Sequence, residues 1–161
     1  MKKNSIVWIV AIAGIVLDQL SKSLIAYLLH PPVTTLPILP NIFHLTYVVN
    51  TGAAFSLFRG GAGWLKWLSL GVSLGLIFLT LRSPRMPKLE QCGYGCILAG
   101  AVGNGIDRFW LGHVIDFLDV RLINFPIFNL ADVFINIGIV CLLLANFSPN
   151  SVSKKRNSSP K

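Results

Sequence analysis

Four long apolar runs constrain this chain more than any other feature. They cover residues 6–29, 64–81, roughly 89–110 and 127–147, and the third is rich in glycine. Each run is close to the ~20 residues that a helix needs to cross a bilayer. Only 12% of the residues are charged, about half the ~25% usual in soluble domains. We therefore expect an all-α membrane protein with four transmembrane helices.

Basic residues predict the orientation of these helices. They lie before the first run, between the second and third runs and after the fourth run, at Lys2, Lys3, Arg82, Arg85, Lys88, Lys154, Lys155, Arg156 and Lys161. Cytoplasmic segments carry such an excess, so both termini should be cytoplasmic. The first run is not expected to be a cleaved signal peptide, because the apolar stretch before Ala11 is too short. The net charge of +8 does not indicate nucleic acid, because the basic residues do not form one patch interleaved with aromatics.

The segment between the first two runs, residues 30–63, has a different character. Four prolines exclude a long helix at its start, and apolar residues alternate over 43–49, which is typical of a strand. We expect a small β-rich element on the outer, periplasmic side. Residues 1–147 should then form a single four-helix domain, followed by a basic, disordered cytoplasmic tail at 148–161.

Polar residues lie at one depth in this arrangement. The stretch 114–134, "VIDFLDVRLINFPIFNLADVF", holds three of the six acidic residues in a mostly apolar context, where an ionised carboxylate is costly. Asp18 lies about 18 Å along the first helix at a rise of 1.5 Å per residue, in the outer leaflet. Lys22, Asn104, Asp107 and the acidic stretch reach the same depth, so these groups should share one site.

Five ordered motifs carry a family resemblance. They are "LDQLSK" (17–22), "NTGAAF" (50–55), "GAVGNGIDR" (100–108), "VIDF" (114–117) and "FNLAD" (128–132). Together they resemble lipoprotein signal peptidase, the type II signal peptidase of bacteria. The resemblance implies an intramembrane aspartic protease of the bacterial inner membrane that removes the signal peptide of a diacylglyceryl-modified prolipoprotein, on the N-terminal side of the lipidated cysteine. One departure is Ala99, where the family usually has a glycine.

The same resemblance assigns the site. The catalytic pair falls on Asp116 and Asp132, and the matching supporting or substrate-binding positions are Asp18, Lys22, Asn50, Gly52, Asn104, Asp107, Arg108, Asn129 and Ala131. Two close carboxylates share one proton and so provide one general base and one general acid. No metal or cofactor is required. The expected partners are prolipoprotein substrates and membrane lipid, and we expect a monomer.

Several alternatives remain open from the residues alone. Asp132 could be a helix N-terminal charge, Asp116 a solvated loop carboxylate, and Asp119 is assigned to that solvated class. Asp18 and Lys22, four residues apart, most simply form a structural ion pair.

The polar amides and the arginine also have two interpretations each. Arg108 could order a helix end or bind lipid phosphate or a substrate carbonyl, and Asn50 and Asn129 could hold substrate or satisfy loop backbone. A proton-coupled transporter is the main alternative function, but it predicts ionisable groups at several depths, and the inner halves of the helices hold almost none. Three cysteines, at 92, 96 and 141, fit core packing better than a metal site.

Overall fold

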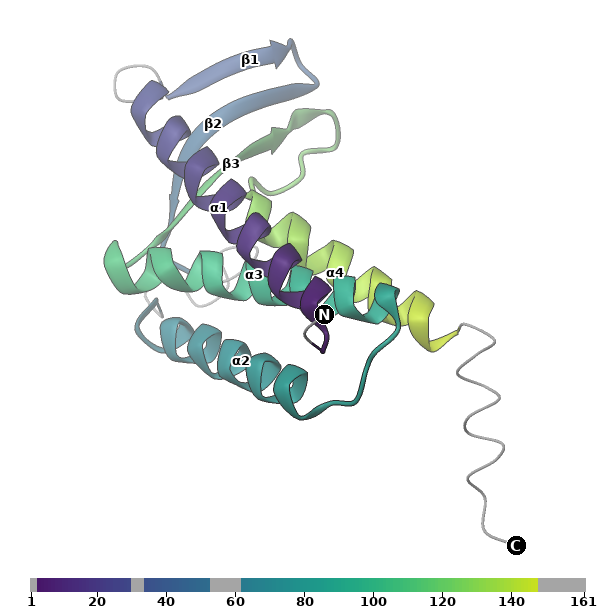
Figure 1. Ribbon diagram of the computed structural model, residues 1–161. Coiled ribbons are helices and arrows are strands. Elements are labelled where there is room, and N and C mark those ends of the chain that lie inside the picture. Colours follow the sequence, from purple (N-terminus) through teal and green to yellow (C-terminus); the bar gives the residue numbers. More distant parts are fainter. Residues whose placement is uncertain (1–2, 30–33, 53–61, 148–161) are drawn as a thin grey trace, which may run out of the picture.

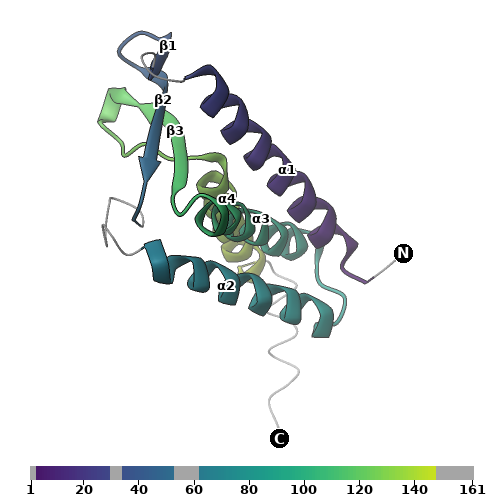
Figure 2. The ribbon, with the colours of Figure 1, turned by 90° about the vertical axis from the view of Figure 1, so that its left-hand side faces the viewer.

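A computed structural model gives the structure of the chain and describes residues 3–29, 34–52 and 62–147. The helix α3 packs against each of the other three helices, and Figures 1 and 2 show it between α2 on one side and α1 and α4 on the other. In chain order the elements are α1 (Ser5–Leu28), β1 (Thr35–Leu39), β2 (Phe43–Asn50), α2 (Ala62–Arg82), α3 (Lys88–Trp110), β3 (Val114–Val120), the short 3-10 helix η2 (Arg121–Ile123) and α4 (Leu130–Asn146).

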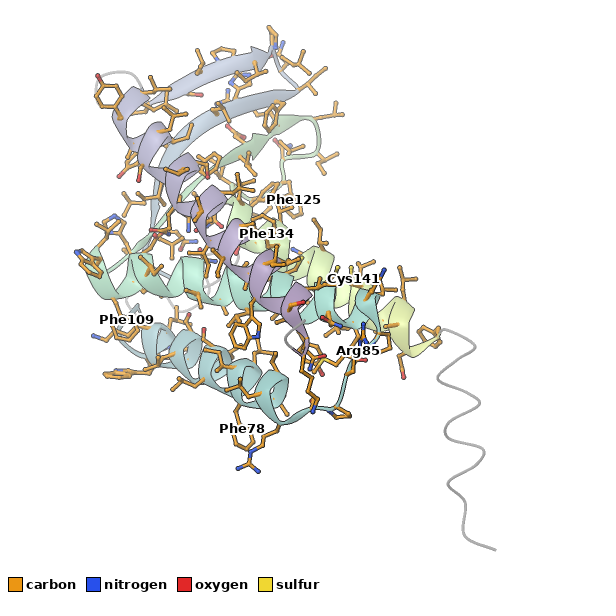
Figure 3. All side chains as sticks on the ribbon, viewed as in Figure 1. Phe78, Arg85, Phe109, Phe125, Phe134 and Cys141 are labelled. Atoms are coloured by element: carbon orange, nitrogen blue, oxygen red, sulfur yellow. The ribbon has the colours of Figure 1, made fainter. Side chains whose placement is uncertain are left out.

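The predicted helices are present, and two of them meet the length and composition expected of a membrane span. These are α1 and most of α2, which are apolar over at least 18 residues. The helix α4 is apolar but has only 17 residues, and α3 does not reach the same mean hydropathy. Large apolar side chains on the outer faces remain exposed; Phe78 of α2, for example, points away from the other helices (Figure 3). Four transmembrane helices therefore stay a prediction.

The β element was predicted only in part. The strand expected at 43–49 is confirmed as β2, but the sheet has three antiparallel strands in the order β1-β2-β3. The third strand comes from the connection between α3 and α4, which the sequence led us to treat as a loop. Its residues are buried on both faces over Val114–Phe117, so it lacks the alternation that reveals a half-exposed strand. The element is thus not confined to residues 30–63.

The start of α4 also differs from the prediction. The apolar run begins at residue 127, but the helix begins at Leu130 with Asn129 as its N-cap. The backbone of Phe128 is engaged elsewhere, because it exchanges hydrogen bonds with Leu118 and accepts one from Phe117 of β3. Asp132 consequently lies in the first turn of the helix, closer to its outer end than the apolar run indicated.

The core at the site end joins the sheet to the helices. Ile25 and Leu29 at the end of α1 pack with Phe117 of β3 into one buried cluster. The sheet therefore lies where α1 ends and α4 begins, while the start of α1 and the end of α4 lie on the opposite side (Figure 1). The predicted tail at 148–161, and residues 30–33 and 53–61 of the predicted β-rich segment, lie outside the described residues.

Close packing between helices depends on small residues. A Cβ on Gly14 of α1 would meet the Cβ of Ala99 on α3 at 2.6 Å, and Ala99 is fully buried. The methyl group of Ala99, the one departure from the family pattern, is therefore accommodated by a glycine on the facing helix. Small residues at such crossings let backbones approach closely, as is common between membrane helices.

Candidate active site

Both predicted catalytic carboxylates line one cavity. Asp116 lies on β3 and is 3% exposed, whereas Asp132 lies in the first turn of α4 and is partly exposed. The cavity has a volume of about 710 Å³ and is bounded by the end of β2, by β3, by the segment 125–129 and by the first turns of α4. The interpretation of Asp116 as a solvated loop residue is wrong, because pairing with Val48 on β2 holds it in the sheet and away from solvent.

Asn129 connects the two carboxylates. Its Nδ2 donates to Asp116 Oδ1 at 2.6 Å, and its Oδ1 accepts from the backbone N–H of Asp132 at 3.1 Å. Asp132 Oδ2 in turn accepts from the backbone N–H of Asn129 at 3.3 Å, which completes a capping box. Asp132 is therefore both a helix N-terminal carboxylate and a cavity residue, so the two interpretations of this position do not exclude each other.

Two further asparagines bind the remaining carboxylate oxygens. Asn50, at the end of β2, donates to Asp116 Oδ2 at 2.8 Å, and Asn104 of α3 donates to Asp132 Oδ1 at 2.9 Å. Each of the four carboxylate oxygens thus accepts a hydrogen bond from an amide. The side chains that hold them come from three separate elements, which fixes the two carboxylates relative to each other.

The environment makes Asp116 a weaker acid than an ordinary aspartic acid side chain. Burial raises the pKa of Asp116 from 3.8 to about 6, and the negative charge of Asp132 acts in the same direction. The hydrogen bonds from Asn50 and Asn129 oppose this rise but do not cancel it. A carboxyl that gives up its proton near pH 6, beside a second carboxylate, can store a proton and release it in a reaction.

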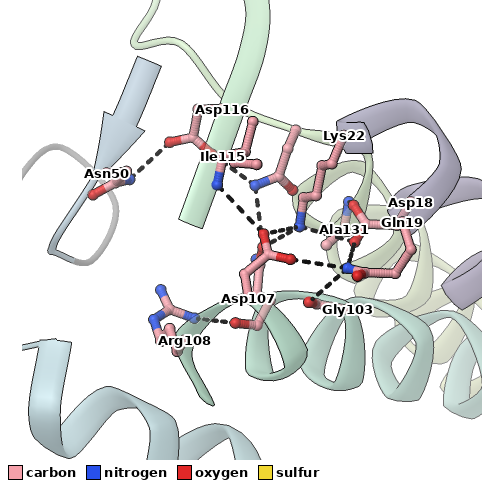
Figure 4. A network of polar contacts seen from close by, with 12 residues as sticks. Asp18, Gln19, Lys22, Asn50, Gly103, Asp107, Arg108, Ile115, Asp116 and Ala131 are labelled. Carbon is pink, nitrogen blue, oxygen red and sulfur yellow. Dashed lines mark hydrogen bonds and ion pairs between the residues drawn. The ribbon is translucent and has the colours of Figure 1, made fainter. Parts of the chain in front are cut away.

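A buried ion-pair cluster joins α1 to α3 close to Asp116 (Figure 4). Lys22 Nζ lies 2.8 Å from Asp18 Oδ2 and 2.9 Å from Asp107 Oδ2, and all three side chains are at most 4% exposed. The predicted Asp18–Lys22 pair is confirmed, and it extends to α3. Lys22 also donates to Asn104 Oδ1 at 3.0 Å, so the cluster orients the amide that holds Asp132.

Asp18 ties this cluster to α4. Its Oδ1 accepts the backbone N–H of Ala131 at 2.9 Å, next to the residues that bear the capping box. The helices meet closely here, since a Cβ on Gly103 would lie 2.5 Å from Asp18 Oδ2 and one on Gly100 would collide with the backbone oxygen of Ala131. Ala131 therefore contributes through its backbone and its small size, which explains why a family motif includes an alanine.

Arg108 joins the end of α3 to the chain after β2. Its guanidinium lies 3.4 Å from the backbone oxygens of Asn104 and Gly52, and the Gly52 N–H donates to Asn50 Oδ1 at 2.9 Å. Arg108 also lines the cavity. Both expected roles, ordering the helix end and facing a ligand, are compatible with this position.

Comparison with known proteins identifies the family. The profile of the family described as signal peptidase (SPase) II matches residues 10–148. The chain belongs to the signal peptidase II family. It is 68% identical over 154 residues to a lipoprotein signal peptidase of Synechocystis sp., covering 96% of this chain and 95% of that protein. A second lipoprotein signal peptidase, from Gloeothece citriformis, is 63% identical over 158 residues, with 98% and 99% covered.

Solved structures agree with this assignment. One described as a bacterial membrane enzyme superposes with a TM-score of 0.79 at 25% identity, covering 96% of this chain and 92% of that chain. A second gives a TM-score of 0.77 at 26% identity, covering 89% and 93%. Signal peptidase II is a protease, and the proton-coupled transporter that we considered from the intramembrane acids is not supported.

The sequence did not identify Gln19 as part of this signal peptidase II site. Gln19 donates to Asp107 Oδ1 at 2.9 Å and to the Gly103 oxygen at 3.2 Å. Gln19 lies three residues before Lys22 on the same helix face, and this spacing could have indicated that it belongs to the site. Asp119, which we expected to be solvated, is buried on β3 and accepts from Thr46 at 2.7 Å. Asp119 does not line the cavity.

The structure offers no arrangement suited to a metal ion in the part that it describes. No group of three or more His, Cys, Asp or Glu side chains is placed to bind one there. The carboxylates of the cavity are instead bound by amides, as described above.

Proposed function

We propose that this chain is an aspartic endopeptidase that removes the signal peptide from diacylglyceryl-modified prolipoproteins, cutting on the N-terminal side of the lipidated cysteine. The observation that carries the proposal is the pair formed by Asp116 and Asp132, which line one cavity and are both held by Asn129. Membership in signal peptidase II supplies the reaction class, and the raised pKa of Asp116 supports the acid–base chemistry.

The pair works by sharing one proton. The ionised carboxylate takes a proton from a water molecule while the oxygen of that water attacks the scissile carbonyl carbon. The protonated carboxyl donates a hydrogen bond to the developing oxyanion and then transfers its proton to the leaving amine, which breaks the peptide bond. We assign the shared proton to Asp116 before the attack, because burial raises its pKa and thereby favours its neutral form. The partly exposed Asp132 is then the group that activates water.

The surrounding residues hold this pair in place. Asn50, Asn104 and Asn129 keep the carboxylate oxygens oriented through hydrogen bonds, which reduces the reorganisation needed during the reaction. The Asp18–Lys22–Asp107 cluster in turn supports Asn104 and the first turn of α4. These residues act by positioning, and the mechanism as proposed uses no metal or cofactor.

We also propose how the chain lies in the membrane. We infer four spans, α1 to α4, in the bacterial inner membrane, with both termini in the cytoplasm and the sheet on the periplasmic side. Trp64, Trp67 and Trp110 support this orientation, because they are exposed on the helix ends nearest the site, where interfacial aromatic residues gather. The site then lies near the outer leaflet, within a single domain of residues 1–147 that acts as a monomer and precedes a cytoplasmic tail.

The test is the turnover of a diacylglyceryl prolipoprotein by purified protein. Loss of the signal peptide is followed as a shift in gel mobility. Asp116→Asn and Asp132→Asn should each reduce turnover by at least about a thousandfold, since each removes one of two groups that act as a unit. Turnover close to that of the unchanged protein in either variant would refute the assigned pair.

Asp119→Asn is the matched control. Asp119 lies on the same strand as Asp116, three residues further on, and is also buried, but it faces Thr46 and Arg121 and not the cavity. The turnover of the Asp119→Asn variant should remain within a fewfold of that of the unchanged protein when equal amounts of folded protein are compared. A loss as large as that of Asp116→Asn would show that burial on this strand, and not the cavity, explains the effect.

A further inference from the structure

One polar side chain in the cavity has no part in the machinery described so far. Asn136 lies on α4, one turn further from the helix start than Asp132, and it lines the same cavity. Its side chain is exposed, and its Nδ2 donates to the backbone oxygen of Asp132 at 2.9 Å. Its neighbours in the cavity wall on this helix are apolar, namely Val133, Ile135 and Ile137.

The hydrogen bond within the helix does not account for an asparagine at this position. It uses one of the two Nδ2 hydrogens, and no hydrogen bond to another described residue is seen for the second hydrogen or for the Oδ1 oxygen. An amide in an apolar, lipid-facing wall is costly unless a partner satisfies it. An apolar residue would avoid that cost at an exposed position, where Asn136 also contributes nothing to packing between helices.

We propose that Asn136 is a substrate-binding residue that donates its free Nδ2 hydrogen to an ester carbonyl of the diacylglyceryl group. This inference rests on the proposed function. The scissile bond lies at Asp116 and Asp132, and Asn136 lies about 6 Å beyond Asp132 along the helix axis, toward the bilayer interior. The lipid is attached to the residue immediately after the cut, so its glycerol esters enter the cavity close to the carboxylates.

The chemistry of the lipid favours this partner. An ester group has acceptor oxygens and no hydrogen to donate, so inside an apolar cavity it needs a donor from the protein. Asn136 supplies a donor at the point where the wall becomes apolar, and the acyl chains can then lie along Val133 and Ile137. A peptide carbonyl of the signal peptide has the same acceptor chemistry, and the experiment distinguishes the two.

The experiment compares two substrates and two proteins. One substrate carries the natural diester, and the other carries a dialkyl ether of equal chain length, which lacks the carbonyls. Asn136→Leu should raise KM for the diester about two- to tenfold, the effect of one lost hydrogen bond, with kcat nearly unchanged. The unchanged protein should show the same rise in KM when the ether replaces the diester, and Asn136→Leu should then add nothing.

Each other outcome has a defined meaning. An equal rise in KM for both substrates would place the partner in the peptide or make the role structural, and would overturn the ester assignment. No rise for either would overturn the inference as a whole. If the unchanged protein cleaves neither substrate, the proposed function fails and the inference with it, so the two failures are distinguishable.

Two variants complete the design. Asn136→Gln keeps an amide donor and should recover most of the diester affinity, which a purely structural role would not predict. Val140→Leu changes a residue one turn further along α4 that is 53% exposed and does not line the cavity, so KM should remain as in the unchanged protein. Both exposed positions tolerate leucine without a packing change, so folding is expected to be preserved.

Discussion

Replacing Asp116 by asparagine should abolish activity and remove the pH dependence of stability that this carboxyl contributes. Burial raises the pKa of Asp116 from 3.8 to about 6 in the folded protein. Because this pKa is higher than in the unfolded chain, the folded state binds the proton more tightly, and stability is lost as the pH rises through 6. At about 1.36 kcal/mol per pKa unit, ionisation of Asp116 lowers the free energy of unfolding by about 3 kcal/mol above pH ~7.

Asparagine has nearly the shape of the protonated side chain and cannot ionise. Its Nδ2 cannot accept the hydrogen bond that Asn50 or Asn129 donates, which costs about 1–3 kcal/mol at every pH. The free energy of unfolding of Asp116→Asn, relative to that of the unchanged protein, should therefore rise by about 2–3 kcal/mol between pH 4 and pH 8, with about 1 kcal/mol of this rise reached by pH 5. Unfolding in detergent micelles at each pH measures this difference. For a chain of this length, that change corresponds to roughly 4–12 °C in Tm.

Asp119→Asn is the control with the opposite sign. Burial alone would raise the pKa of Asp119, but hydrogen bonds from Thr46 and Arg121 and the Arg121 charge together lower it. A lowered pKa contributes stability at neutral pH that is lost as the pH falls through the folded-state value. Asp119→Asn should therefore be less stable at pH 8, with a deficit that shrinks on acidification. An Asp116→Asn variant whose stability relative to the unchanged protein is the same at pH 4 and pH 8, or falls between them, would refute the reasoning.

Three further predictions concern the same network. Lys22→Met leaves two buried carboxylates without a cation and should cost about 3–5 kcal/mol of stability, measured as the unfolding midpoint in micelles. Gly103→Ala should reduce both stability and turnover, because the added methyl group would lie 2.5 Å from Asp18 Oδ2. The control Gly75→Ala, on an open face of α2, should change stability and turnover only slightly. In the free enzyme the pair loses its shared proton near the raised pKa of Asp116, so kcat/KM should fall as the pH rises through about 6 in a pH–rate profile.

The helices could be predicted because the apolar runs in the sequence are about as long as the helices themselves. The runs that begin at residues 6 and 89 correspond to α1 and α3, whose first residues are Ser5 and Lys88. The start of α4 could not be found this way. Residues 127 and 128 are as apolar as the helix itself, but the backbone of Phe128 pairs with β3, and only the capping geometry at Asn129 marks the boundary.

The third strand could not be predicted for a related reason. Period-2 alternation arises when one face of a strand meets water, and β3 is buried on both faces over its first four residues. Its two acids, Asp116 and Asp119, therefore read as loop residues, although both are buried in the sheet. Their different surroundings depend on which strand lies opposite, and that is a tertiary contact with no local signal in the sequence.

Depth in the membrane was enough to bring the acids together but not to assign their partners. The sequence predicts that the polar groups at this depth share one site, and it does not say which of them bind Asp116 and Asp132. Among the described residues, the ion pairs of Lys22 go to Asp18 and Asp107, and no ion pair joins a cation to Asp116 or Asp132.

This division of partners explains how one network can be both stable and reactive. A cation close to Asp116 would hold its carboxylate ionised and lower its pKa, which would remove its capacity to carry a proton near neutral pH. Neutral amides from Asn50 and Asn129 orient the same oxygens and leave burial as the dominant influence. The positive charge of Lys22 stabilises the scaffold one layer behind, between Asp18 and Asp107, where no proton transfer is needed. The charge of Lys22 lowers the pKa of Asp116 less than burial raises it, so Asp116 keeps the capacity to hold and release a proton.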